Sequence, residues 1–290
     1  MMYTPRLVRA IPVFCLLAAA SSLLMGCETN PYTGRSQLLM TSVNQEVQMG
    51  AQAYNQVKSD PKMRPSQDPR EIEPVKRVAA RIVEAAKRSK YAEMAKQFQW
   101  EVTVIKDDKT ANAFALPGGK MAVYTGIFPM TKTEAGLAAV MGHEVVHALA
   151  RHGAERMSQG QVANVGLQVV GAAIGLSGGN PMLGQATMAA LGAGAQVGVL
   201  LPFSRKHESE ADYVGILLAA DAGYDPRESV ALWERMGQAS GGGGPAEFLS
   251  THPSHDTRID QLKEWMPEAM AIYQKRAPMP ATPLPEVGGR

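Results

Sequence analysis

The chain has 290 residues, with 29 Lys or Arg against 27 Asp or Glu and a formal net charge of +2. A near-neutral protein without a long basic run gives no reason to expect a nucleic-acid partner. The two cysteines, Cys15 and Cys27, both fall in or beside an N-terminal targeting segment. The rest of the chain has no thiol for a disulfide or a catalytic nucleophile, which excludes a cysteine protease. The length suffices for one main domain with a sizeable core.

Residues 1–26 are predicted to be a targeting segment rather than part of the fold. Two arginines precede a mostly apolar stretch over 11–24 that is too short to span a bilayer comfortably. The sequence LMGC, which ends at Cys27, resembles the cleavage site of bacterial lipoproteins and predicts a lipid on that cysteine. By the same resemblance, Glu28 favours the periplasmic face of the outer membrane. The alternative is an ordinary secretory signal with an incidental cysteine.

The elements that follow predict an α+β fold that is mainly helical. Helices are expected over 42–58 and 72–89, separated by an exposed loop with three prolines. A strand is expected over 100–106, because apolar and polar side chains alternate there. Residues 112–125 predict two more short strands around a Pro-Gly-Gly turn. Together these strands would form a small β-sheet beside the next helix.

The segment 134–157 carries the chemistry. His143 and His147 are four residues apart, and Glu144 follows the first histidine. On a helix, residues four apart lie on one face, so the two histidines can bind one ion and Glu144 can reach a water on it. This H-E-x-x-H pattern is typical of zinc peptidases. A capping box at Thr131, with a glutamate three residues later, predicts the helix start. The alternative is an ordinary helix that carries these residues by chance.

Residues 160–203 form a long apolar run without a charged side chain. We expect close-packed helices near the active site, with a cover over it as one reading, rather than a membrane insertion. Beyond this run, Glu208 and Asp212 lie four residues apart on another predicted helix. Glu208 can complete a His-His-Glu ligand set with an open fourth position, and Asp212 can hydrogen-bond a ligand histidine. The alternative is a solvated acidic face. His207 is expected at the surface or behind the ligands.

HEVVH, followed about sixty residues later by SRKHESEAD, resembles the zinc endopeptidases related to the CAAX prenyl protease and the bacterial heat-shock membrane protease. NAFALPGG before the helix and THPSHDTRI after the glutamate match that group as well. The resemblance runs from about Asn30 to Leu262. With its lipoprotein start, the chain looks most like the periplasmic branch, which acts in outer-membrane protein quality control. The resemblance implies a zincin-like fold, one Zn²⁺ per chain bound by His143, His147 and Glu208, Glu144 as general base, and Asp212 as support for a ligand.

The motif at the end of this resemblance contains His252 and Arg258. His252 is expected to be either a displaceable fourth ligand that keeps the enzyme latent or a hydrogen-bond donor to the developing oxyanion. Arg258 is expected in the second of these roles or as an anchor of the loop. A structural turn residue is the alternative for His252, and His255 is expected at the surface. A last helix over 257–276 is expected to be disturbed by its proline.

The predicted function is zinc-dependent cleavage of unfolded or misassembled proteins. Zinc would lower the pKa of a water and polarise the scissile carbonyl, and Glu144 would move the proton. An extended substrate is expected along the sheet edge, although a purely structural hairpin is an equal alternative. That edge comprises Asn112, Ala113, Phe114, Ala115 and Leu116.

Other readings remain open from the sequence. One is a chaperone-like binding or assembly factor for outer-membrane proteins with a latent zinc site, and another is a hydrolase of cell-wall peptides. Expected partners are unfolded substrates, the outer membrane through the lipid, and an outer-membrane assembly machinery. The predicted boundaries are a signal peptide over 1–26, a lipidated lead-in over 27–41, a zinc metallopeptidase domain over 42–276 and a disordered Pro-rich tail over 277–290.

Overall fold

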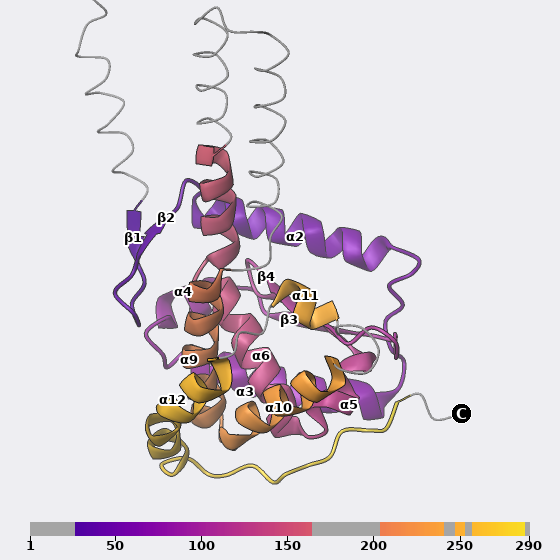
Figure 1. Cartoon of the computed structure of the whole chain (residues 1–290). Coiled ribbons are helices and arrows are strands. Elements are labelled where there is room, and N and C mark those ends of the chain that lie inside the picture. Colours follow the sequence, from indigo (N-terminus) through magenta and orange to yellow (C-terminus); the bar gives the residue numbers. More distant parts are fainter. Residues whose placement is uncertain (1–26, 164–203, 241–246, 253–256, 288–290) are drawn as a thin grey trace, which may run out of the picture.

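The computed structural model describes residues 27–163, 204–240, 247–252 and 257–287 (Figure 1). The predicted α+β, mainly helical class is confirmed. The strands are β1 (Cys27–Thr29), β2 (Ser36–Leu38), β3 (Glu101–Ile105), β4 (Ala113–Leu116) and β5 (Lys120–Tyr124). The helices are α2 (Val43–Ser59), α3 (Pro69–Ala86), α4 (Ala92–Gln97), α5 (Phe128–Thr131), α6 (Glu134–Leu149), α9 (Arg205–Asp221), α10 (Arg227–Ser240), α11 (Glu247–Thr251) and α12 (Arg258–Tyr273). Residues 152–163 are also helical.

The first two long helices begin at side-chain caps. The Ser42 side chain accepts a hydrogen bond from the Gln45 backbone N–H, and the Ser42 backbone N–H donates to the Gln45 side chain at 2.8 Å, so a capping box starts α2. Helix α3 begins three residues before the predicted position, at Pro69. The Asp68 side chain accepts from the backbone of the second residue of α3, and a proline fits the first helical position because no donor is needed there.

The start of α6 differs from the predicted capping box. Thr133, not Thr131, is the N-cap, and its Oγ1 accepts from the Gly136 backbone at 3.1 Å. Thr131 ends the short helix α5 instead, where its hydroxyl donates to the Ile127 carbonyl at 3.2 Å. The chain then turns through Lys132, whose φ is 59°. Because Thr131 is the last residue of α5, the predicted cap lies two residues too early.

Helix α6 crosses the centre of the molecule and packs against α9 and α3 (Figure 1). Two glycines allow the backbones of α6 and α9 to touch. A Cβ built on Gly142 would lie 2.8 Å from the Gly215 carbonyl oxygen, and one on Gly215 would lie 2.9 Å from the His143 nitrogen. Any larger side chain would separate the helices. This close approach brings the first turns of α9 next to the motif on α6.

The three-stranded sheet has the order β3-β5-β4. Strand β5 runs parallel to β3 and antiparallel to β4, with Ala113 opposite Val123 and Leu116 opposite Lys120. The tight turn between β4 and β5 places Gly118 and Gly119 at positive φ, as the predicted hairpin requires. Within the part of the chain that the structure describes, β4 is an edge strand, and it lies beside α6.

The C-terminal segment corrects the prediction of a disordered tail. The Glu134 nitrogen at the start of α6 donates to the Thr282 carbonyl at 2.9 Å, and the Leu284 nitrogen donates to the Lys132 carbonyl at 2.8 Å. Leu284 is only 8% exposed. A helix start has backbone donors without partners inside the helix, so residues 277–287 are ordered because they satisfy one of these donors. Only 288–290 lie outside the described residues of this tail.

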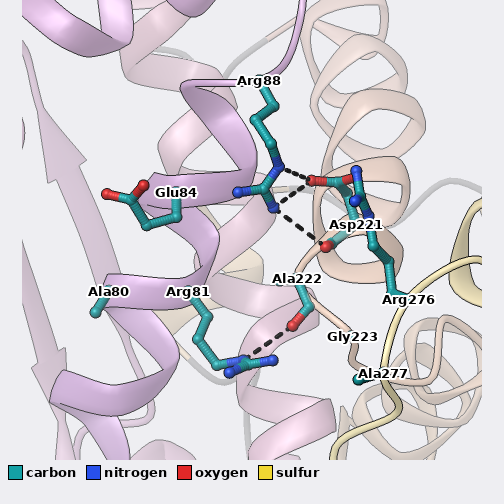
Figure 2. A pocket seen from close by; sticks show the side chains of 9 residues that line it. All are labelled: Ala80, Arg81, Glu84, Arg88, Asp221, Ala222, Gly223, Arg276 and Ala277. Carbon is teal, nitrogen blue, oxygen red and sulfur yellow. Dashed lines mark hydrogen bonds and ion pairs between the residues drawn. The ribbon is translucent and has the colours of Figure 1, made fainter.

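The junction between α12 and this segment is fixed by arginines (Figure 2). Arg276 and Arg88 both pair with the Asp221 carboxylate at the end of α9, the latter at 2.6 Å. Helix α12 continues through Pro267, so this proline does not interrupt the helix.

The predicted close-packed helices over 160–203 fall mostly on residues 164–203, which lie outside the described residues. Among the helices that the structure does describe, none combines the length and the apolar character needed to cross a bilayer.

Candidate active site

Helices α6 and α9 bring the predicted ligands together. Nε2 of His143 and Nε2 of His147 are 3.0 Å apart. The Glu208 carboxylate faces both rings, with its oxygens 3.3 Å from Nε2 of His147 and 3.5 Å from Nε2 of His143. All three side chains are buried. Helical spacing aligns the two histidines, and the contact between the glycines places Glu208 opposite them.

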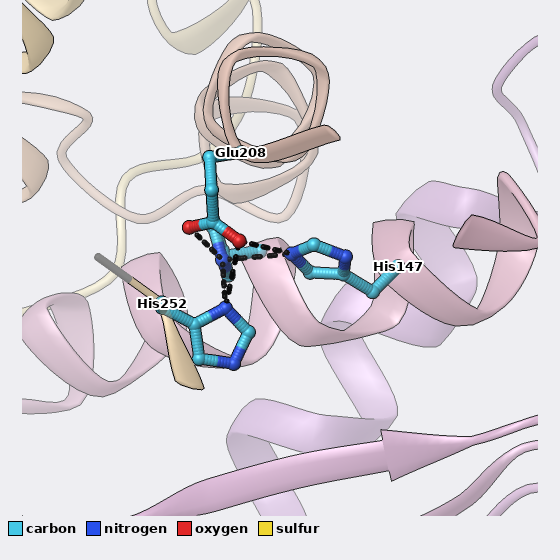
Figure 3. A group of neighbouring side chains, drawn as sticks. His147, Glu208 and His252 are labelled. Carbon is cyan, nitrogen blue, oxygen red and sulfur yellow. Dashed lines mark hydrogen bonds and ion pairs between the residues drawn. The ribbon is translucent and has the colours of Figure 1, made fainter. Parts of the chain in front are cut away.

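His252, which follows α11, is the fourth member of this group (Figure 3). Its Nδ1 lies 3.0 Å from Glu208 and 3.1 Å from Nε2 of His143. Its ring stacks on Phe248 at a centroid distance of 4.6 Å. The Phe248 nitrogen donates to the Ala111 carbonyl, next to the sheet edge, at 3.1 Å. His252 therefore points into the metal group rather than serving only as a turn residue.

The donor set of this group fits zinc. It offers three imidazole nitrogens and a carboxylate oxygen, all within 4.8 Å of one another. Zinc prefers four such ligands in a tetrahedron, and bond lengths of about 2.0–2.1 Å would separate neighbouring donor atoms by about 3.3 Å. The spacings that join His143 and Glu208 to each other and to the other two residues are 3.0 to 3.5 Å, which is close to that value. Burying four such groups without an ion would be costly.

Burial and mutual charge set the ionisation of the group. Burial lowers the pKa of His147, which favours the neutral ring that binds metals. Burial acts to raise the pKa of Glu208, but the neighbouring histidines outweigh it and hold this pKa well below its ordinary value. The Glu144 carboxyl is also buried, and this burial raises its pKa. A raised pKa makes the Glu144 carboxylate a stronger base, as a proton acceptor requires.

Asp212 and Arg258 support the ligands from behind. Oδ1 of Asp212 lies 2.9 Å from Nδ1 of His143. Arg258 donates to Asp212 at 2.6 Å and to Glu208 at 3.1 Å, is 1% exposed, and lies 3.4 Å from the centre of the Trp233 ring. The contacts of Arg258 are therefore those of an anchor for Glu208 and Asp212. The expected position of Asp212 beside a ligand histidine agrees with this geometry.

The base candidate lies between the metal group and the sheet. Oε1 of Glu144 is buried and accepts no hydrogen bond within the described residues, and Nε2 of His252 is 3.3 Å away from it. The backbone N–H of Ala115 on β4 lies close enough to this carboxyl to favour its charged form. The predicted substrate edge over 112–116 thus runs next to Glu144. Asn112 itself caps the strand, because its Oδ1 accepts from the Ala113 nitrogen at 2.8 Å.

Two buried histidines depart from the sequence analysis. His207 is 2% exposed and its Nε2 lies 3.1 Å from Glu155, so the surface reading is wrong. His152 is not singled out by the sequence, yet its Nδ1 lies 3.0 Å from Nδ1 of His147. The sequence shows this histidine five positions after His147. Helical spacing does not place it on the face of the ligands, so the pattern alone does not indicate the contact. His255 lies outside the described residues.

Cys27 is the first described residue and pairs with Leu38 in the β1–β2 hairpin. Its lipid stays a prediction, as does the signal peptide before it.

Comparison with known proteins gives the family. The model of peptidase family M48 matches residues 70–266. The mitochondrial metalloendopeptidase OMA1 of Schizosaccharomyces pombe is 41% identical over 82% of this chain and 66% of its own length. The protein of the same name from Saccharomyces cerevisiae is 32% identical over 84% and 70%. The beta-barrel assembly-enhancing protease of Escherichia coli K12 is 30% identical over 80% and 46%. The chain spans about two thirds of the length of the two yeast relatives, and about half or less of the bacterial, plant and animal ones.

These relatives correct the predicted location. The fungal, plant and animal proteins are all named mitochondrial, which contradicts the periplasmic face of a bacterial outer membrane. A segment with two arginines, no acidic residue and an apolar stretch does not separate these destinations, because transit peptides are also Arg-rich and poor in acids. The periplasmic branch is likewise not supported beyond the family level. The motifs, the buried donor group and the match over more than half of its length agree that this chain belongs to peptidase family M48 and is a zinc-dependent metalloendopeptidase.

Proposed function

We propose that this metalloendopeptidase cleaves unfolded or loosely folded proteins and serves in protein quality control. The observation that carries the proposal is the position of Glu144, between the metal group and the edge strand β4. An edge strand offers main-chain donors and acceptors to any extended peptide, with little regard for its sequence. Folded proteins rarely expose an extended segment, so such a site selects chains that have lost their structure.

In this proposal His143, His147 and Glu208 hold the zinc. When bound, zinc supplies Lewis-acid polarisation of a carbonyl and lowers the pKa of a water. Glu144 takes a proton from the attacking water at its Oε1, which lies 3.3 Å from Nε2 of His252, and returns it to the leaving amine. Arg258 and Asp212 keep the ligand side chains in place through the contacts described above.

The substrate backbone would pair with Ala113, Ala115 and their neighbours along β4. The Ala115 backbone lies near the Glu144 carboxyl, so a peptide added at this edge would place its carbonyls within reach of the base. The side chains of this strand are small or apolar, which suits a substrate of varied sequence.

A second candidate is a protein that binds unfolded chains while its zinc site stays latent. The observation that favours it is His252, which fills the fourth position of the metal group. A peptide carbonyl and this imidazole would compete for the same place. The two candidates differ in one respect, because only the peptidase needs Glu144 as a base.

The test compares cleavage of one protein in its unfolded and folded forms by the purified full chain. The wild type and Glu144→Gln are assayed at equal zinc content. We expect wild type to cleave the unfolded form, and Glu144→Gln to bind it without cleavage. Equal cleavage by the two proteins would reject the role of Glu144. No cleavage by a zinc-loaded wild type that binds the unfolded form would favour the second candidate.

A further inference from the structure

The ring of His147 has a second polar neighbour on the side away from the metal group. Its Nε2 faces Glu208, and its Nδ1 lies 3.0 Å from Nδ1 of His152. The other nitrogen of His152 lies 3.0 Å from the Glu210 carboxylate. His152 is fully buried and Glu210 nearly so. These three side chains, His147, His152 and Glu210, form a line that leads from the metal group into the interior, and we call it the His152 line.

Metal binding at Nε2 of His147 fixes every proton in this line. A neutral imidazole carries one proton, and the nitrogen that binds a metal cannot carry it. Nδ1 of His147 is then a donor, and Nδ1 of His152 has to accept from it. The proton of His152 consequently lies on Nε2 and is donated to Glu210. Each hydrogen bond has one donor and one acceptor, so the line is consistent only in this direction.

The far end of the line is held by the N-terminal hairpin. Arg35, which immediately precedes β2, donates to both oxygens of Glu210 at 2.8 Å. The Thr33 hydroxyl donates to the same carboxylate at 2.5 Å, and the Asn30 amide lies at 3.3 Å. A guanidinium in this two-pronged arrangement keeps a buried carboxylate charged and fixed in orientation. Glu210 is therefore a rigid acceptor for His152.

The backbone is bent so that His152 can reach His147. A regular helix would place a residue five positions on about 140° around the axis from His147. Instead α6 ends and Arg151 adopts a φ of 58°, in the left-handed region that non-glycine residues rarely occupy. The Arg151 side chain holds this turn through Glu46 at 2.6 Å and the Thr41 carbonyl at 2.6 Å. The strained turn and the buried polar groups both cost stability, which favours a role at the metal group over simple packing.

We propose that His152 and Glu210 are positioning residues for His147. They hold its ring in the orientation and the tautomer that bind zinc, as Asp212 does for His143 at 2.9 Å. The two histidines of the motif thus have different supports, a carboxylate for one and an imidazole backed by a carboxylate for the other. Through Arg35, the N-terminal hairpin becomes part of the support of the metal site. The inference rests on the proposed binding of zinc by His147.

Two substitutions of His152 test its hydrogen bonds to His147 and to Glu210 separately. In His152→Asn, the amide oxygen can occupy the place of Nδ1, so the acceptor for His147 is kept. In His152→Gln, the longer side chain can donate to Glu210 from the place of Nε2, but the acceptor for His147 is lost. The zinc Kd of each full-length protein is measured by competition with a chelator. We expect a Kd close to wild type for His152→Asn and about 10- to 100-fold weaker binding for His152→Gln.

His207→Gln is the matched control. His207 is equally buried and stacks on His152 at 4.5 Å, but its Nε2 pairs with Glu155 rather than with a ligand. We expect it to keep the wild-type zinc Kd. His147→Ala tests the ligand itself and should lose most of the affinity. Thermal unfolding of the zinc-free proteins checks that each variant folds.

Equal zinc affinity in His152→Asn and His152→Gln would overturn the proposal, and so would an equal loss in His207→Gln. Wild-type affinity in His147→Ala would overturn it by a different route, because His147 would then not be a ligand at all. If a variant folds only with metal, the visible absorption of its Co²⁺ form decides. A changed spectrum in His152→Gln alone supports the proposal, and identical spectra in all variants overturn it.

Discussion

Gly142 on α6 and Gly215 on α9 are in backbone contact, and a Cβ on Gly215 would lie only 2.9 Å from the His143 nitrogen. The contact determines how far Glu208 and Asp212 stand from the two histidines. It lies between two helical backbones, so no flexible side chain can move aside to admit a methyl group. The contact between these two glycines therefore packs the helices together and also sets the geometry of the metal group.

We expect Gly215→Ala to destabilise the fold by about 1–3 kcal/mol, the usual cost of overpacking, and to weaken zinc binding. Urea unfolding and a zinc competition assay measure the two effects. Gly237→Ala on α10 is the control, since a Cβ there meets nothing within 4 Å. That variant should be neutral or gain about 0.5–1 kcal/mol from helix propensity. A Gly215→Ala protein as stable as Gly237→Ala would contradict the packing argument.

His252→Ala should increase cleavage of an unfolded protein. The imidazole now fills the position that a substrate carbonyl needs, so its removal makes the open state permanent. If the open state is populated one tenth of the time in wild type, the increase is about tenfold. Initial rates at equal zinc content measure it, and the double variant His252→Ala with Glu144→Gln should be inactive. A decreased rate in His252→Ala would instead assign His252 to oxyanion stabilisation.

The sequence predicted the parts of the site that depend on local geometry. His143, Glu144 and His147 lie on one helix, where spacing alone sets their arrangement, and Glu208 and Asp212 lie on another. The relative placement of the two helices depends on a glycine contact between positions 142 and 215, which no local pattern reveals.

The errors have the same cause. His152 reaches His147 only because Arg151 adopts a positive φ, and a regular helical projection excludes that contact. The Pro-rich tail has the composition of a disordered segment, yet it is ordered over 277–287 by the backbone donor of Glu134 and by burial of Leu284. Composition indicates whether an isolated segment is disordered, but here tertiary contacts order the segment.

Removal of zinc should lower the melting temperature. Without the ion, the donor atoms of His143, His147, His252 and Glu208 are buried facing one another. A ligand present at a thousand times its Kd stabilises by about 4 kcal/mol, which corresponds to about 8–16 °C for a domain of this size. Calorimetry with and without a chelator measures the shift, and added Zn²⁺ should reverse it. An unchanged melting temperature after verified zinc removal would show that the group contributes no metal-linked stability.

The ion pair between Arg35 and Glu155 should make the protein sensitive to acid. Burial acts to raise the pKa of Glu155, but hydrogen bonds from His207, Arg35 and Gln37 outweigh it and hold this pKa well below its ordinary value. A carboxyl with a depressed pKa in the folded state contributes stability above its ordinary pKa near 4.5, and this contribution is lost as the pH falls below that value. Removing Arg35 should bring the pKa values of Glu155 and of its other partner, Glu210, back toward normal.

We therefore expect Arg35→Met to be less stable than wild type at pH 7, and the difference to shrink between pH 5 and pH 3. Urea unfolding of zinc-free protein across this range measures it without interference from the metal. Arg70→Met is the control, because Arg70 forms an exposed ion pair with Asp68, and solvent-exposed pairs contribute little to stability. A difference between Arg35→Met and wild type that stays constant with pH would show that Arg35 stabilises the hairpin by packing alone. Its charge would then have no part in holding Glu155.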